Sequence, residues 1–127
     1  MTALTAVAPA DPAGIFQDGL ARGGLRYQRC RWCADRSAGA RLLCATCGGT
    51  DFVWARSSGQ GRIHRMPPAP AAGAECLAVV ELDEGFRTHA RIAAVPAHRL
   101  WQGAPVRLEA ATGDGGALRL VFCPVAA

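Results

Sequence analysis

Alternation of apolar and polar positions is clearest in the second half of the chain. Four segments there are predicted to be β-strands: the first is an apolar and β-branched run, and the other three alternate with a period of two, which is typical of half-buried strands. The segments are 76–82, 85–92, 105–110 and 117–123. Asp83-Glu84-Gly85 predicts a hairpin turn with glycine at a positive φ angle, and TGDGG at 112–116 predicts a second turn. These patterns together predict a β-rich module.

Two more stretches complete this module. SSGQGRIHRM contains Gly59 and Gly61, which predict a bend where one strand passes into the next sheet. PAHRLWQG, at 96–103, predicts a one- or two-turn helix or a loop. Five strands with one short helix before the fourth indicate a small closed or partly open antiparallel barrel.

The N-terminal part of the chain contains one helical pattern, at 12–22. Asp11 provides an N-cap and Pro12 a first helical residue, and Gly23-Gly24 ends the pattern. The apolar face consists of Ile15, Phe16 and Leu20. A helix this short must lie on something to be stable, and either the rest of this chain or a partner could provide that surface.

Four of the six cysteines stand in two C-x-x-C pairs, CRWC and CATC. They are Cys30, Cys33, Cys44 and Cys47. Two such turns supply the four soft ligands that tetrahedral structural zinc prefers, so the spacing predicts a Zn²⁺ site closed to water, with no metal catalysis. Redox dithiols or core cysteines are the less favoured alternative. Zinc and iron are not distinguished by the spacing.

The chain divides into three predicted regions. Residues 1–24 form a loose tail and the short helix, 25–56 form a zinc ribbon, and 57–127 form the barrel. Strand-like pieces of the ribbon are expected at 25–28, 41–43 and 52–56. The Pro- and Ala-rich stretch 67–75 is expected to be an exposed loop.

Composition narrows the class of protein further. The chain has 127 residues, half of them hydrophobic, which is enough to build a core. It lacks both an apolar run of membrane-spanning length and a secretory signal pattern, so we expect a cytoplasmic protein. All fourteen Lys+Arg residues are arginines. Four thiolates with one Zn²⁺ contribute −2, which lowers the formal charge of +4 to about +2 and weakens an argument for nucleic acid from charge alone.

Arginines are concentrated in the predicted ribbon. They are Arg26, Arg29, Arg31, Arg36 and Arg41. A phosphate-binding patch is one interpretation, and charge compensation for the metal centre is the one we favour for most of them. Trp32 stands between the first two predicted ligands, where it either contacts a partner or covers the sulfurs.

The remaining reactive side chains form no catalytic motif. Cys76 and Cys123 lie in predicted strands and are interpreted as small hydrophobic residues rather than nucleophiles. Arg87, His89 and Arg91 alternate with apolar residues and share a polar face. With Arg107 and Arg119, they could form a surface for an anionic ligand or an acidic partner, although outward arginines usually form only a solvated face.

Two alternative functions remain at this stage. Zinc ribbons and small barrels often bind single-stranded nucleic acid, but such binding uses aromatic stacking platforms. The only aromatic residue between 60 and 100 is Phe86, which the alternation places inside the barrel, so nucleic acid is a weak alternative. A stand-alone enzyme using Cys76 or Cys123 is the other alternative.

The order of motifs along the chain resembles a known family. The motifs are LRYQRCRWC, CATCGG, SGQGRI, VVELDEGFR, QGAPVRL and LVFCP. They resemble the acyl-CoA-associated family of zinc-ribbon plus OB-fold proteins, formerly a domain of unknown function, from about Phe16 to Pro124. That family usually has glycine after each C-x-x-C pair. Here Ala34 follows the first pair, so we expect a slightly different turn there.

The resemblance implies a rubredoxin-like ribbon followed by an OB-fold, with zinc at the four paired cysteines. It also implies a non-catalytic accessory subunit of a thiolase-superfamily enzyme complex, with possible contact to acyl-CoA. A sterol-type acyl-CoA aldolase or hydratase complex is the alternative partner. We expect Phe16, Leu20 and Trp32 to contact the partner, and Arg87, His89 and Arg91 to contact a ligand.

Overall fold

The computed structural model describes residues 12–38, 41–67, 74–109, 111–112 and 118–125. Its elements, in chain order, are α2 (Pro12–Ala21), β1 (Leu25–Cys30), β2 (Arg36–Ala38), β3 (Phe52–Ser57), β4 (Gln60–Arg65), β5 (Cys76–Leu82), β6 (Arg87–Ile92), η1 (Ala97–Arg99), β7 (Pro105–Leu108), β8 (Ala111–Thr112), β9 (Leu118–Arg119) and β10 (Val121–Pro124). None of the described helices is long and apolar enough to span a bilayer.

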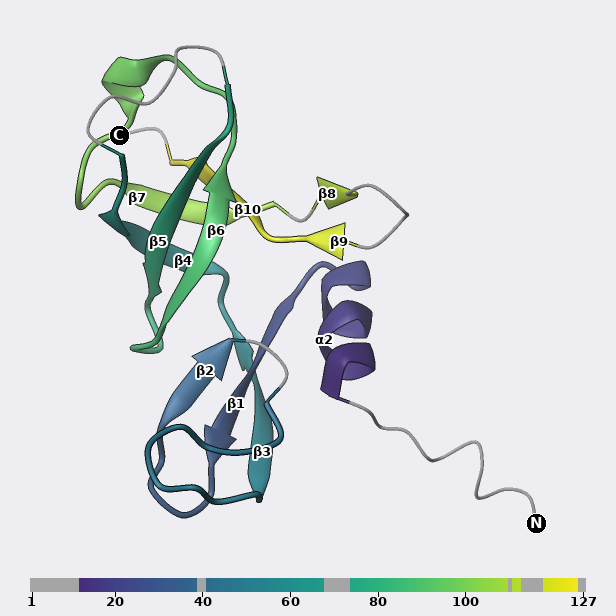
Figure 1. The fold of residues 1–127 in the computed structure, drawn as a ribbon. Helices are drawn as coiled ribbons and strands as arrows, with labels where there is room; N and C mark the ends of the chain where they lie inside the picture. The colour runs from purple at the N-terminus through teal and green to yellow at the C-terminus, as the bar shows by residue number, and fades with distance from the viewer. Residues whose placement is uncertain (1–11, 39–40, 68–73, 110, 113–117, 126–127) are drawn as a thin grey trace.

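The strands form a small sheet and a barrel (Figure 1). The sheet has the order β2-β1-β3, and the barrel closes in the order β10-β6-β5-β4-β7. β8 and β9 form a separate pair beyond the barrel strands. This arrangement confirms the predicted fold class, a mostly β chain with a short N-terminal helix and a closed five-stranded barrel of the OB type. The division into three domains stays a prediction.

The predicted N-terminal helix is confirmed, and it lies on this chain rather than standing free. α2 contacts β1 and β9, and Leu20 is buried while Phe16 packs against the main core cluster. The helix ends in a Schellman motif: the Gly24 N–H donates to the Gly19 carbonyl and the Gly23 N–H to the Leu20 carbonyl, both at 2.9 Å. The expected N-cap Asp11 lies outside the described residues.

Three strand predictions need correction. Arg41–Leu43, expected to be a strand, is a bend, and Arg36–Ala38 pairs with β1 instead. The Gln28 side chain explains the bend, because it satisfies both backbone groups of Arg41: Gln28 Nε2 donates to the Arg41 carbonyl at 3.1 Å, and the Arg41 N–H donates to Gln28 Oε1 at 2.8 Å.

The other two corrections concern the barrel. Its β10–β6 pair is parallel, although an antiparallel barrel was expected. The expected strand 105–110 ends at Leu108 as β7, and β8 follows it at Ala111–Thr112. The expected strand 117–123 is divided into β9 and β10. Thr112, the first residue of the expected turn 112–116, lies in β8, and the rest of that turn and most of the loop 67–75 lie outside the described residues.

One hydrophobic core joins the sheet to the barrel. Leu25 and Tyr27, on β1, belong to the same buried cluster as the inward residues of the barrel strands. The Tyr27 and Phe86 rings lie 4.7 Å apart between centroids, with a 30° angle between their planes. Burying Leu25 completely stabilises the fold by about 1.5–3 kcal/mol. Part of the barrel's stability therefore depends on the position of β1.

A carboxylate forms a second contact between the sheet and the barrel. Glu84, in the turn between β5 and β6, accepts hydrogen bonds from the Ser57 hydroxyl at 2.6 Å and the Ser58 N–H at 2.8 Å. The turn itself is as predicted, with Gly85 at φ 93° and its N–H donating to the Leu82 carbonyl at 2.8 Å. Desolvation raises the pKa of Glu84, but the bonds from Ser57 and Ser58 outweigh it, and the pKa is lowered.

The close approach of β4 to β5 generates a first prediction. A Cβ added at Gly61 would lie 2.4 Å from the Glu81 carbonyl oxygen, which is backbone and cannot rotate away. We expect Gly61→Ala to lower the free energy of unfolding by about 2–3 kcal/mol in a denaturant titration. Gly24→Ala is the matched control, since its Cβ would meet only the flexible Arg56 side chain at 3.2 Å. Equal stability of the two variants would contradict this account.

The Glu84 bridge generates a second prediction. Glu84→Gln should lower the free energy of unfolding at pH 7 by about 1.5–3 kcal/mol, because it removes hydrogen bonds to a charged acceptor. The pKa of Glu84 is lower in the folded state than its ordinary value of 4.5. The stabilisation by the ionised Glu84 is therefore fully present above pH 4.5 and is lost as the pH falls through the folded-state pKa. The difference between wild type and variant should therefore narrow in acid.

The control for this pH titration is Asp83→Asn, in the same turn, whose exposed carboxylate makes no side-chain hydrogen bond with the described residues. It should have little effect at any pH. A stability difference for Glu84→Gln that stays constant from pH 7 to pH 3 would show that the bridge is not the titrating interaction.

Candidate metal centre and surface hollows

The two C-x-x-C turns fold into matching loops. The Ala34 N–H donates to the Cys30 carbonyl and the Gly48 N–H to the Cys44 carbonyl, both at 2.9 Å. The Cys30 N–H donates to the Asp35 carbonyl and the Cys44 N–H to the Gly49 carbonyl, both at 2.8 Å. Each loop thus repeats the same backbone hydrogen bonds around its first cysteine.

Ala34 adopts the conformation that glycine has in the second loop. Its φ angle is 66°, and that of Gly48 is 76°. The expectation of a different first turn was therefore wrong, because alanine is held in the left-handed region by the same hydrogen bonds. That conformation costs a non-glycine residue about 1–2 kcal/mol.

The loops bring the four predicted ligands together. All four sulfurs lie within 4.8 Å of one another, and all six cysteines of the chain are free thiols. The Cys30 and Cys47 sulfurs are 3.6 Å apart, as are those of Cys33 and Cys44. A tetrahedron with Zn–S bonds of about 2.3 Å has edges of ~3.8 Å, so the arrangement fits a single ion. These cysteines could bind a metal ion such as zinc.

Backbone N–H groups point at the sulfurs. The Trp32 N–H lies 3.4 Å from the Cys30 sulfur. At Cys44, the Cys47 N–H, aided by that of Thr46, outweighs desolvation and lowers the pKa to about 6. At Cys33, the Asp35 N–H lowers the pKa, but desolvation and the neighbouring sulfurs raise it to about 12. Four sulfurs this close cannot all be thiolates unless a cation compensates their charge.

Several arginines of the ribbon pair with aspartates rather than with the sulfurs. Arg41 lies 3.0 Å from Asp35, and its guanidinium stacks 4.9 Å from the Phe52 ring centroid. Arg31 lies 3.2 Å from Asp51. These ion pairs connect residues of the loops that carry the cysteines. The sequence analysis expected the arginines to compensate the charge of the metal centre and did not predict these pairs.

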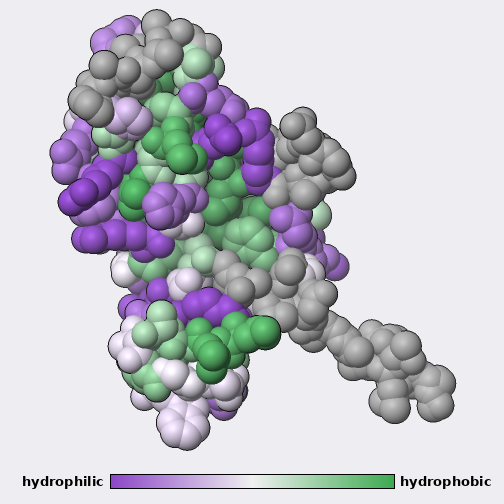
Figure 2. Space-filling model, in the orientation of Figure 1, coloured by the Kyte–Doolittle hydropathy of each residue, from purple (hydrophilic) through white to green (hydrophobic). Residues whose placement is uncertain are grey.

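Of the three expected partner contacts, Trp32 presents an exposed side chain, with 77% of its surface accessible. Leu20 is 2% exposed and Phe16 half-buried, because α2 covers its own chain. The sequence analysis missed Leu42 and Leu43, which are 76% and 60% exposed and directly precede Cys44. We call Trp32, Leu42 and Leu43 the ribbon apolar surface. Figure 2 shows one group of strongly hydrophobic side chains on the lower part of the molecule, where the strands β1–β3 lie in Figure 1.

The expected ligand residues Arg87, His89 and Arg91 do share the outer face of β6, where all three are exposed. Arg87 lies 3.5 Å from Glu81, which competes with an anion for this guanidinium. His89 lines two shallow hollows of about 230 and 220 Å³, and Arg91 lines the second. Arg119 is paired with Glu75 at 2.9 Å. Whether this face holds a ligand stays a prediction.

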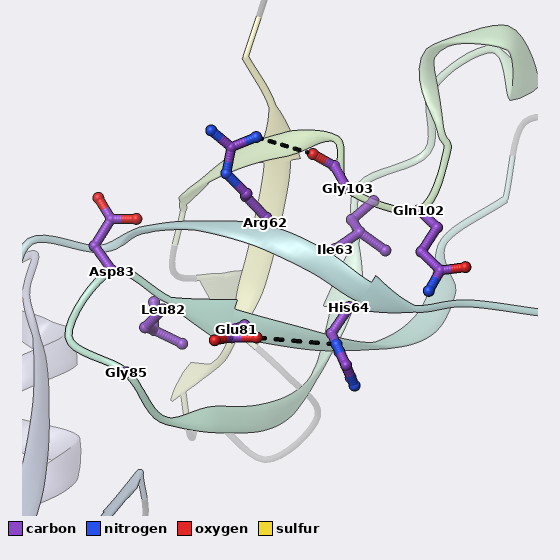
Figure 3. A pocket seen from close by; sticks show the side chains of 9 residues that line it. All are labelled: Arg62, Ile63, His64, Glu81, Leu82, Asp83, Gly85, Gln102 and Gly103. Carbon is purple, nitrogen blue, oxygen red and sulfur yellow. Dashed lines mark hydrogen bonds and ion pairs between the residues drawn. The ribbon is translucent and has the colours of Figure 1, made fainter.

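Another hollow, of about 450 Å³, lies elsewhere on the barrel (Figure 3). Its polar lining mixes both charges: Arg62, His64, Glu81, Asp83 and Gln102. Arg62 donates to the Gly103 carbonyl at 3.3 Å, and His64 lies 3.9 Å from Glu81, too far for a hydrogen bond. The residues that line it include no thiol or hydroxyl nucleophile.

The two unpaired cysteines do not form a reactive site. Cys76 is 7% exposed, and burial raises the pKa of its thiol, which disfavours the nucleophilic thiolate. Cys123 lies half-buried on β10. These positions support the interpretation of both as small hydrophobic residues.

Solved structures include chains that are similar to this one. The chain is similar to a DUF35 chain of the solved structure described as "Ltp2-ChsH2(DUF35) aldolase". The TM-score is 0.68 at 25% sequence identity, over 92% of this chain and 97% of the other. The likeness supports a DUF35-like protein. No family model and no curated protein matches the sequence.

The left-handed Ala34 generates a third prediction. Ala34→Gly should raise the free energy of unfolding of the metal-loaded protein by about 1 kcal/mol, because it relieves the strained backbone. Gly48→Ala is the mirror control. It should lower the free energy of unfolding by a similar amount, because alanine would be strained at φ 76°, and no clash adds to this strain because a Cβ there meets nothing within 4 Å. Denaturant unfolding measures both. A destabilised Ala34→Gly protein would contradict the account.

Proposed function

We propose that this chain is a non-catalytic accessory subunit of a hetero-oligomeric enzyme complex that acts on acyl-CoA thioesters. The observation that carries the proposal is the likeness over nearly the whole chain to a DUF35 chain of an aldolase. Both the ribbon and the barrel are included in that likeness, so it supports a similar role for the protein as a unit. The motif resemblance in the sequence points to the same class.

The chemistry of the site favours a structural role for the metal. Cys30, Cys33, Cys44 and Cys47 supply four sulfur ligands, which fills a tetrahedral ion and leaves no position for water or substrate. Zn²⁺ is the ion we propose, because closed four-sulfur sites are typical of structural zinc. Cys76 is buried, so it is a poor candidate for a nucleophile of an independent enzyme. The catalytic groups then belong to the partner.

Two partner classes are compatible with this role. A thiolase-superfamily enzyme is the class that the motifs favour, and an acyl-CoA aldolase is the class that the description of the structural neighbour favours. In both cases, we propose that the ribbon apolar surface contacts the partner. Trp32 lies between two ligands and Leu42 and Leu43 precede a third, so the metal would fix the backbone that carries all three exposed side chains. Exposed tryptophans are common anchors of interfaces.

A fourth prediction tests this proposal. Affinity purification of the tagged chain at native expression should recover a catalytic acyl-CoA enzyme, and the mixture should show thiolase, aldolase or hydratase activity. The triple variant Trp32→Ser/Leu42→Ser/Leu43→Ser should lose the partner while keeping its metal. Leu77→Ser is the matched control, since Leu77 is 55% exposed on the barrel and outside the ribbon apolar surface.

Purification of the wild-type chain alone, with no effect on any acyl-CoA activity of the extract, would contradict the proposal. If the triple variant retains the partner, the interface lies outside the ribbon apolar surface.

A further inference from the structure

Two arginines stand directly opposite each other where β1 pairs with β3. Arg26 is the cross-strand partner of Arg56, so both side chains project from the same face of the sheet. Directly opposite Cβ atoms in an antiparallel pair are about 4.5–5.5 Å apart, and like charges there are destabilising. This arrangement is unfavourable unless an anion lies between the two guanidinium groups.

The chain itself provides little negative charge to offset the repulsion between Arg26 and Arg56. A third arginine, Arg22, follows the last turn of α2, and Asp18 is shared between it, at 3.1 Å, and Arg26, at 3.8 Å. Arg56 makes no side-chain hydrogen bond or ion pair with the described residues. Its guanidinium lies over the bare backbone of Gly24, where an added Cβ would be 3.2 Å from Arg56 Nε. Two of the three arginines thus share one carboxylate, and Arg56 has no carboxylate partner among the described residues.

These arginines line a hollow formed by β1, β3 and the turn that joins α2 to β1. Figure 1 shows the position of these elements. The volume of the hollow is about 440 Å³, and its lining also includes Trp54. Trp54 is two residues from Arg56 on β3 and therefore faces the same side of the sheet. A second hollow of about 290 Å³ shares Arg56 and adds Ser58 and Arg107.

We call these two hollows the arginine groove. Neither hollow has a carboxylate in its lining. The larger hollow on the barrel differs, because Glu81 and Asp83 line it and would repel an anion. The two hollows around His89 are smaller, at about 230 and 220 Å³, and the Arg119 that lines one of them is already paired with Glu75. The arginine groove is therefore the better site for a polyanion.

We propose that the arginine groove binds a nucleoside diphosphate. Arg26 and Arg56 contact the phosphates, which removes their mutual repulsion, and Trp54 stacks on the base. Guanidinium groups form charge-assisted hydrogen bonds with phosphate oxygens, and a tryptophan face stacks on any base. Arg107 lies at the far end of the groove, where it meets a more extended phosphate chain. This site does not depend on the proposed accessory role and uses none of the metal ligands.

The test is calorimetric titration of the metal-loaded full chain with ADP at low and physiological salt. We expect saturable one-to-one binding that weakens as salt increases. Arg56→Gln should weaken ADP binding at least tenfold. Trp54→Leu should weaken ADP binding roughly tenfold but change pyrophosphate binding by no more than about twofold. Arg62→Gln, on the barrel, is the matched control and should bind ADP like the wild type.

Thermal unfolding separates loss of binding from loss of folding. Because Arg56→Gln removes a like-charge pair, it should raise the melting temperature of the ligand-free protein by about 1–4 °C at low salt. The same variant should lose the stabilisation that ADP gives the wild type. A variant that fails to fold would instead melt lower both with and without ADP.

The adenosine diphosphate unit occurs in free nucleotides and at one end of coenzyme A, so both compounds are titrated. Tighter binding of coenzyme A assigns the groove to the coenzyme, and tighter or equal binding of ADP assigns it to a free nucleotide.

Three results would overturn the proposal: no ADP binding at millimolar concentration; equal binding of ADP and pyrophosphate with no effect of Trp54→Leu; or tighter binding of polyglutamate or a single-stranded oligonucleotide than of ADP.

Discussion

The fold of the N-terminal half depends on the convergence of four sulfur atoms. Around the two loops, the fully buried groups are Cys30, Cys44 and the amide of Gln28, whereas Leu42 and Leu43 face outward. Hydrophobic burial therefore contributes little there, and a metal ion bound by the four sulfurs would be strong enough to order the loops. β1 runs from this cluster into the barrel core through Tyr27 and Leu25. The position of the metal centre thus affects the barrel as well.

The junction gives a physical meaning to two sequence motifs that are distant along the chain. The serines before Gly59 donate hydrogen bonds to Glu84, in the turn that follows β5. Gly61, in the same SGQG motif, lets β4 approach the backbone of β5 where a side chain would collide. The two motifs therefore form one contact that fixes the sheet relative to the barrel. An accessory subunit that holds a partner in a defined orientation would require such rigidity.

Local chemistry made much of this structure predictable. The C-x-x-C spacing predicted the sulfur cluster, the two-residue period predicted the outward positions of β6, and Pro12 and Gly23 predicted the limits of α2. The errors arose where distant groups decide the outcome. The buried Gln28 amide holds Arg41 in a bend instead of the expected strand, and α2 buries Leu20 on its own chain. The opposition of Arg26 and Arg56 follows from strand register, which the sequence pattern does not specify.

The central claim is that a closed tetrathiolate metal centre orders the ribbon and, through β1, supports the barrel. Elemental analysis combined with amide NMR of the purified chain, before and after chelation, tests it most directly. The account predicts one zinc ion per chain and, after chelation, loss of dispersed signals from both cysteine loops together with perturbed signals from Leu25 and Tyr27. A chain that contains no bound metal, with loop signals that are dispersed and unchanged by chelator, would contradict it.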